Sequence, residues 1–471
     1  MSRSKASKRG SARKNTPAAK APQKKTARAR KPREASSAET IAKKQREISV
    51  SEFFAKNRHL LGFDNPSKAL LTTVKELVDN SLDAADEANI PADVEVRIDE
   101  LAEDRFLVRC TDNGPGIVAR NVPSVFGKLL YGSKFHRLKM SRGQQGIGVS
   151  AAGMYGLLTT GKPVKVVSRT SPKKSAQRFE IAIDTQKNQP TVKSQEDTKW
   201  DSSHGTQVEI ELEASYRKGQ HSVDNYIRQI SLANPHAQLT YLPPDRSSDA
   251  DIQVFERVTN ELPPETAEIK PHPYGVELGL MMQWLRESTH RNLQGFMSNE
   301  FSRVSSRLAG EICDTAGLPR TKKPKAIDQP AAEKLHKAIQ KTKIMSPPTD
   351  CIAPIGEELL GQAMQSIHPS EFSTAVTRRP AVYRGNPFLV EVSLAFGCDD
   401  ISAEDSAVMY RYANRVPLQY QQGACAVTKA TSSTDWKKYG LQQPRGGMPT
   451  GSMVIMVNIA SVWVPFTSES T

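Results

Sequence analysis

Hydrophobic positions at helical spacing open the folded part of the chain, and alternating positions follow them. Residues 49–66 have helical character, and a longer helix is predicted over residues 67–88 with Ser67 as its cap. Val94, Val96 and Ile98 alternate with polar residues, as in a strand with one buried face. Further strands are predicted at residues 106–110, 164–169, 178–183 and 207–212. One layer of helices on a mixed sheet accommodates this order of elements.

A different pattern begins near residue 271, where helical spacing replaces alternation. Helices are predicted at residues 275–289, 293–309 and 331–341, joined by turns rich in Pro and Lys. A helix at residues 357–366 then precedes strands at residues 388–396, 407–412 and 453–463. We therefore expect an α+β protein whose folded parts span residues 48–264, 265–345 and 346–471, since 471 residues exceed one ordinary core.

The net charge of +14 is concentrated at the N-terminus. Residues 1–47 hold 16 Lys and Arg against 3 Glu, which leaves 49 basic and 48 acidic side chains in the remainder. With almost no large apolar residue, this tail cannot offset its ordering entropy and is predicted to be disordered. It would neutralise the phosphates of double-stranded DNA in a salt-dependent way. The alternative is an extension that increases solubility or that binds RNA.

Other compositional features limit the class of protein. No apolar run is long enough to span a membrane, and no apolar segment follows the basic N-terminus as a secretory signal requires. We therefore expect a cytoplasmic protein associated with the nucleoid and no membrane partner. The cysteines are scattered and odd in number, which predicts reduced, structural thiols. They are Cys110, Cys313, Cys351, Cys398 and Cys425.

The first candidate for chemistry lies on the long helix, in the phrase K-E-L-V-D-N-S-L-D. Glu76, Asn80 and Asp83 are spaced i, i+4 and i+7, so a helix places them on one face. A carboxylate there can act as general base toward a water, and an amide oxygen can hold the Mg²⁺ that bridges phosphates. Taken alone, the same spacing also fits the solvated face of an amphipathic helix.

Two glycine-containing phrases follow. In T-D-N-G-P-G-I, Asp112 precedes a turn with Gly114 and Gly116, which by itself could be an ordinary turn with a capping Asp. The phrase S-R-G-Q-Q-G-I-G-V at residues 141–149 leads into a helix rich in small residues. Its glycines permit several backbone N–H groups to face one anion, which predicts a phosphate site. It fits neither a Walker loop nor a Rossmann turn.

Together, the helical E-x-x-x-N-x-x-D, the D-x-G-x-G and the Gly-rich phrase resemble the GHKL ATPase superfamily. The resemblance implies a Bergerat ATP-binding α/β sandwich with ATP and Mg²⁺ as cofactors. In it, Glu76 would activate water, Asn80 would ligate Mg²⁺, and Asp112 would accept the adenine amino group near Thr206. The remaining nucleotide contacts implied by the resemblance are Asp83, Gly114, Gly116, Ser133, Lys134, Arg142, Gly143, Gln144, Gln145, Gly146, Ile147, Gly148 and Val149.

Within that superfamily, the phrase G-K-L-L-Y-G-S-K-F-H-R-L-K-M-S-R-G-Q-Q-G-I-G-V-S-A-A at residues 127–152 resembles topoisomerase VI B subunits. The likeness continues through H-P-Y-G-V-E-L at residues 272–278, which opens a helix-two-turns-helix module, and through Y-A-N-R-V-P-L-Q-Y and V-W-V-P-F-T-S-E-S of a transducer domain. It implies a type IIB topoisomerase that dimerises on ATP and joins a DNA-cleaving A subunit in an A2B2 heterotetramer. Such an enzyme relaxes supercoils and decatenates DNA.

One position departs from the pattern. The family's transducer lysine, which reaches the γ-phosphate, would follow S-E-S, where Thr471 stands. We expect either a truncated sequence or reduced coupling, with Lys429 as a possible substitute unless it is a solvated loop residue. The alternatives are another GHKL enzyme (MutL-like, chaperone-like or, less in keeping with the basic tail, a histidine kinase) or a DNA-binding partner protein with impaired ATP coupling.

Overall fold

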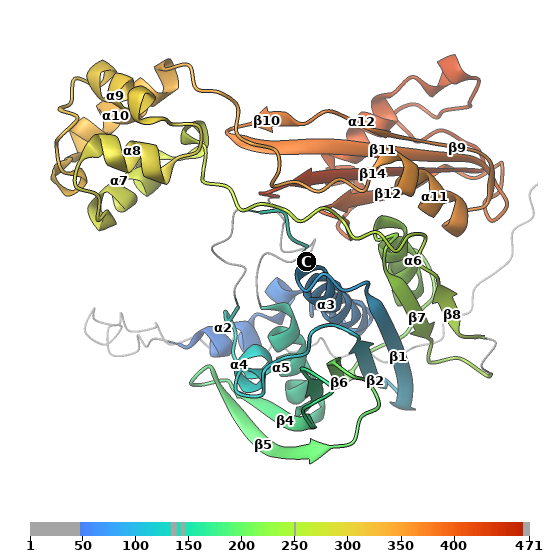
Figure 1. Cartoon of the computed structure of the whole chain (residues 1–471). Helices are drawn as coiled ribbons and strands as arrows, with labels where there is room; N and C mark the ends of the chain where they lie inside the picture. The colour runs from blue at the N-terminus through green and yellow to red at the C-terminus, as the bar shows by residue number, and fades with distance from the viewer. Residues whose placement is uncertain (1–47, 133–138, 143–146, 249–250, 465–471) are drawn as a thin grey trace, which may run out of the picture. The chain divides into compact units, whose positions relative to one another are not determined.

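The computed structural model describes residues 48–132, 139–142, 147–248 and 251–464 (Figure 1). The predicted basic arm at residues 1–47 lies outside the described residues. The first elements are α2 (Val50–Lys56), η1 (Arg58–Leu61) and α3 (Pro66–Glu87). Within the described ranges, the chain has no helix with the length and apolar character needed to cross a membrane.

Helix α3 begins one residue earlier than predicted, and its cap is Asn65 rather than Ser67. The Asn65 side chain accepts a hydrogen bond from the Lys68 amide at 2.9 Å. Pro66 takes the first helical position, where its missing N–H costs nothing. Because Pro66 already has the helical φ, the cap must lie before it, which is why Ser67 is inside the helix.

The first sheet is mixed, as predicted, and runs in the order β5-β4-β3-β6-β2-β1-β7-β8. Neighbouring strands are antiparallel except β1 and β7, which are parallel. The strands are β1 (Asp93–Ala102), β2 (Arg105–Asp112), β3 (Val164–Arg169), β4 (Ala176–Asp184), β5 (Gln189–Thr198), β6 (Gly205–Glu213), β7 (Gln238–Leu242) and β8 (Gln253–Phe255). The predicted mixed sheet is present, and strands β1, β2, β3, β4 and β6 lie where alternation predicted them.

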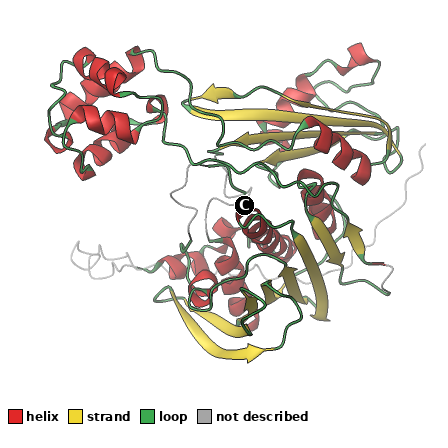
Figure 2. Ribbon diagram, in the orientation of Figure 1, coloured by secondary structure: helices red, strands yellow, loops and turns green. Residues whose placement is uncertain are grey.

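Helices pack on this sheet and enclose the first core (Figure 2). Besides α3 they are α4 (Val122–Gly127), α5 (Gly148–Thr160) and α6 (Val223–Ala233). Alternate residues of β2 are buried, and Val108 and Cys110 lie in the same apolar cluster as Val74 and Val78 of α3. The core therefore fixes α3 against the end of β2, where the candidate residues lie.

The following helices form a separate apolar cluster that includes Leu285, Phe296 and Leu335. The elements are η4 (Pro273–Gly275), α7 (Leu278–Glu287), α8 (Leu293–Glu300), α9 (Ser306–Thr315), η5 (Pro324–Ala326) and α10 (Gln329–Lys341). The single helix predicted over residues 293–309 was wrong, because Arg303 has a positive φ of 60° and Ser305 caps a new helix through the Leu308 amide.

The last part is a second α/β unit. Its sheet runs in the order β10-β11-β14-β12-β13, with β9 also paired to β11 and with β12 parallel to β14. The elements are α11 (Glu357–Ile367), β9 (Ser370–Thr377), β10 (Ala381–Tyr383), β11 (Asn386–Cys398), β12 (Val408–Ala413), β13 (Val416–Pro417), η6 (Gln422–Ala424), α12 (Ala426–Ser433), η7 (Trp436–Tyr439) and β14 (Met453–Ser461). All the cysteines are buried free thiols, as predicted.

Candidate nucleotide site

Asp112 ends β2 and is buried against the start of β6. Its Oδ1 accepts hydrogen bonds from the amides of Gly114 at 2.9 Å and Thr206 at 3.1 Å, and its Oδ2 accepts from the Ser81 hydroxyl at 3.0 Å. Burial raises the pKa of Asp112, while these three donors act in the opposite direction. The result is a carboxyl group in one fixed orientation, suited to accept a hydrogen bond from an amino group of a ligand.

Two glycines allow the backbone to close around Asp112. Gly116 has φ +70°, and a Cβ there would lie 2.1 Å from the Arg169 carbonyl oxygen. Gly205 has φ +135°, and its Cβ would lie 2.1 Å from the Asp112 carbonyl oxygen. Any larger residue would push these backbone segments apart, so the D-x-G-x-G phrase and residues 204–206 pack backbone against backbone.

Glu76 projects from α3 toward the first residue of α5. A Cβ on Gly148 would lie only 1.6 Å from Glu76 Oε2, so the carboxylate occupies the space that a side chain would need. On its other side, Glu76 Oε1 lies 3.7 Å from the Lys75 ammonium group, and the Glu76 side chain is 19% exposed. The structure thus brings the helical E-x-x-x-N phrase into contact with the end of the Gly-rich phrase. Ile147 is buried beside this contact, and Val149 is half-buried.

The other two residues predicted on this face of α3 differ in their surroundings. Asn80 is exposed, and its Nδ2 donates to the Glu76 carbonyl oxygen at 2.6 Å, so its amide oxygen is the atom that could reach a cation. Asp83 is buried and accepts a hydrogen bond from Arg142 at 3.0 Å. Two residues predicted to contact nucleotide therefore bind each other.

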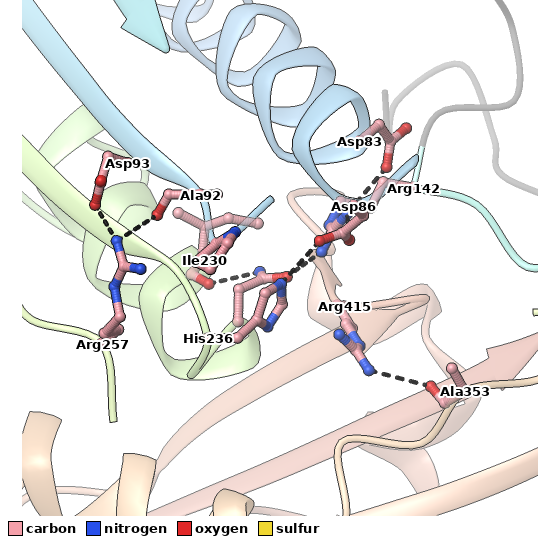
Figure 3. Close-up of polar contacts among 12 residues, drawn as sticks. Asp83, Asp86, Ala92, Asp93, Arg142, Ile230, His236, Arg257, Ala353 and Arg415 are labelled. Carbon is pink, nitrogen blue, oxygen red and sulfur yellow. Dashed lines mark hydrogen bonds and ion pairs between the residues drawn. The ribbon is translucent and has the colours of Figure 1, made fainter. Parts of the chain in front are cut away.

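Figure 3 shows the polar network around Arg142. Its guanidinium group also bonds Asp86 at 2.6 Å and donates to the side-chain oxygen of Asn234. The His236 ring lies 3.0 Å from the second Asp86 oxygen. Asp86, Asn234 and His236 were not predicted from the sequence. Only the D-A-A-D spacing, which stacks Asp86 one turn after Asp83, could have indicated the first of them.

Some predicted residues have no described position. Thr471 and six of the predicted nucleotide contacts lie outside the described residues. Those six are Ser133, Lys134, Gly143, Gln144, Gln145 and Gly146. Lys429, considered as a substitute for the transducer lysine, is exposed on α12 and so is helical rather than part of a loop. Thr206 lies beside Asp112, with its hydroxyl 3.4 Å from that of Ser168.

Comparison with known proteins decides among the families considered above. Residues 65–216 match the family described as histidine kinase-, DNA gyrase B- and HSP90-like ATPase, and residues 347–471 match the topoisomerase VI B subunit transducer. The chain is 48% identical to the B subunit of type 2 DNA topoisomerase 6 from Methanococcoides burtonii over 434 residues, which cover 92% of this chain and 69% of that protein. The chain belongs to the topoisomerase VI B subunit family.

A second member of the topoisomerase VI B family supports the same assignment. The Archaeoglobus fulgidus protein is 46% identical over 91% of this chain and 70% of its own length. Membership makes the chain an ATP-binding GHKL subunit of an ATP-dependent type II DNA topoisomerase. A solved B-subunit of the DNA gyrase from Myxococcus xanthus is also similar, with a TM-score of 0.40 and 11% identity over 87% of this chain and 85% of that one.

Proposed function

We propose that the chain binds ATP and Mg²⁺ between α3, the end of β2 and the start of α5, and hydrolyses ATP with Glu76 as general base. The observation that supports this proposal is that residues of α3 position two carboxyl groups in different surroundings. Ser81 holds the buried Asp112 by hydrogen bonding, whereas Glu76 stays partly exposed beside Gly148. A buried, oriented carboxyl group suits adenine recognition, and an exposed one can take a proton from water.

The remaining roles follow from position. The N-terminus of α5 offers backbone N–H groups and a favourable dipole for phosphate, next to Glu76. The amide oxygen of Asn80 would ligate Mg²⁺, and the bound ion would neutralise phosphate charge. Gly114, Gly116 and Thr206 would border the adenine with Asp112. The contacts predicted for Ser133, Lys134 and residues 143–146 stay predictions.

At the level of the assembly, we propose that two copies dimerise on ATP, join two DNA-cleaving A subunits, and admit one DNA duplex through another. ATP can favour the closed dimer only through contacts it makes there and not in the open form. Relaxation of supercoils and decatenation would be the outcome, and the protein would act at the nucleoid in the cytoplasm. Family membership supports this part of the proposal.

The decisive experiment compares Glu76→Gln with the native chain in ATP binding and in hydrolysis. The amide keeps the shape of the carboxylate but cannot take a proton. We expect ATP binding to persist and turnover to fall by roughly 10²- to 10⁴-fold. Glu87→Gln, which neutralises an exposed carboxylate at the end of the same helix, is the matched control and should change neither quantity. Normal turnover by Glu76→Gln would show that another group is the base.

A further inference from the structure

The start of the Gly-rich phrase is held by Arg142, for which the resemblance implies a nucleotide contact. The Arg142 side chain is only 5% exposed. One of its terminal nitrogens donates to both Asp83 and Asp86 (Figure 3). The other donates to the side-chain oxygen of Asn234. These partners come from the last turns of α3 and from the residue after α6, so one planar group joins three parts of the first domain.

The charge balance explains why an arginine stands at this position. Burial alone would raise the pKa of Asp86, but Arg142 and His236 together lower it below its usual range. Two carboxylates thus share the positive charge of one guanidinium group. A lysine carries the same charge on a single nitrogen and lacks the planar guanidinium group that can donate to several acceptors at once. Arg142 therefore fixes geometry as well as charge.

The same backbone is bonded on its other side to residues of the transducer. The Ser141 carbonyl oxygen accepts a hydrogen bond from Asn414 Nδ2 at 3.0 Å, and the Met140 amide donates to the Cys351 carbonyl oxygen at 3.2 Å. Asn414 is fully buried, and its side-chain oxygen accepts from the Ser461 amide at the end of β14. Residues 140–142 are consequently bonded both to the helix that carries Glu76 and to the transducer sheet.

We propose that Arg142 is a positioning residue for ATP binding, which ties the backbone leading into the predicted phosphate-binding residues to α3, and that Asn414 ties the same backbone to the transducer. This inference rests on the proposed function. The Arg142 guanidinium group bonds Asp83, Asp86 and Asn234, and through these bonds it would fix the distance between Glu76 and the chain ahead of Gly148. A displacement of the transducer at Asn414 would then alter the affinity for ATP.

The first test is Arg142→Lys in the full chain, with the dissociation constants of ATP and of adenosine measured side by side. Loss of the forked guanidinium group should raise the dissociation constant of ATP on the order of tenfold, because contacts to phosphate weaken steeply when they are misplaced. Adenosine carries no phosphate and should change by less than about twofold, since Asp112 and its donors stay in place. General destabilisation would instead lower the number of binding sites and leave both constants unchanged.

The chain offers a matched control in the same close-up. Arg257 bonds the Asp93 carboxylate and the Ala92 carbonyl oxygen, away from the Arg142 network (Figure 3). Arg257→Lys makes the same substitution at an arginine whose two bonds come from one terminal nitrogen, and it should leave the dissociation constant of ATP at its native value. An equal weakening of ATP in both variants, or an unchanged constant in a folded Arg142→Lys, overturns the proposal.

A second variant tests the transducer side. Asn414→Asp keeps the acceptor for the Ser461 amide and tolerates the φ of 51°, but in its ionised form, at a pH well above that of carboxyl titration, it cannot donate to Ser141. It should weaken ATP in the same direction as Arg142→Lys, and the double variant should be no weaker than the worse single one. Independent, multiplying losses would refute the link. All these measurements need only ATP binding, so they stay interpretable if Glu76 proves not to be the base, and a chain that binds no ATP would refute the proposed function instead.

Discussion

At the scale of single residues, the geometry of the candidate site depends on glycines, at positions where a side chain would not fit. Gly116 and Gly205 bring backbone against backbone, and each has a positive φ that glycine adopts without strain. Gly148 is different, because it lies in a helix and its missing Cβ makes room for the Glu76 carboxylate. The sequence alone assigned Gly116 to a turn and Gly148 to a phosphate contact, but could not show that Gly148 makes room for the Glu76 carboxylate.

Gly148→Ala should separate stability from catalysis. Gly148 is the first residue of α5, where the preference for alanine is smaller than the roughly 1 kcal/mol of a helix interior, and the partly exposed Glu76 side chain can move aside, so the free energy of unfolding should change by less than about 1 kcal/mol. The new methyl group would displace Glu76, which lies 1.6 Å from the Cβ position, and single-turnover ATP hydrolysis should slow by on the order of a hundredfold. Gly361→Ala is the control, because its Cβ on α11 would meet nothing within 4 Å. Equal hydrolysis in the two variants would argue against the position of Glu76.

At the scale of elements, α3 is the part of the site that the sequence predicted best. Its helical period and the spacing of Glu76, Asn80 and Asp83 were readable directly, and the structure places the helix within one residue of the predicted ends. The partners of α3 could not be predicted from the sequence. Ser81 bonds Asp112, which lies 31 residues away in the sequence, and Asp83 bonds Arg142, which lies 59 residues away. Long-range pairing depends on sheet order, which local periodicity does not contain.

A second interaction of α3 gives a stability prediction. The Tyr226 hydroxyl of α6 donates to Asp79 at 3.1 Å inside the core. Burial raises the pKa of Asp79 to about 6, although Lys75 acts in the opposite direction. Between about pH 4 and 6 the folded chain therefore holds a proton that the unfolded chain has released, so Asp79 lowers stability as the pH rises through this window.

Asp79→Asn should remove this pH dependence while its side-chain oxygen still accepts from Tyr226. Above about pH 7 the variant should be more stable than the native chain by roughly 2–3 kcal/mol, and the difference should vanish near pH 4. Urea unfolding at a series of pH values measures it. Asp64→Asn, at a more exposed carboxylate ahead of α3, controls for the change from a carboxylate to an amide. A constant difference for Asp79→Asn across the range would mean that Asp79 is ionised throughout.

At the scale of the whole molecule, the sequence predicted the fold class correctly but missed some of the helices and strands. Strands β1, β2, β3, β4 and β6 were predicted from the sequence. Strand β7 was missed although its burial alternates over five residues, and β5 was missed because most of its residues are exposed and polar, which leaves no alternation to detect. Helix α6 was missed as well, although Ser222 caps it and its Tyr226 hydroxyl donates to Asp79. The domain limits at residues 264 and 345 stay predictions, while separate apolar clusters on either side of residue 265 are consistent with them.

The charge distribution leads to a prediction about DNA. Residues 48–471 are nearly neutral, with 49 basic and 48 acidic side chains, whereas residues 1–47 carry 16 basic and 3 acidic ones. If the tail neutralises DNA phosphates, deleting residues 1–47 should flatten the plot of log binding constant against log salt by about 0.9 for each phosphate that is no longer neutralised. An uncharged Gly/Ser segment of the same length should not restore the slope, because only charge releases counterions. A slope that survives the deletion would place the DNA-binding residues in the folded domains, and the tail would then act as a solubilising extension.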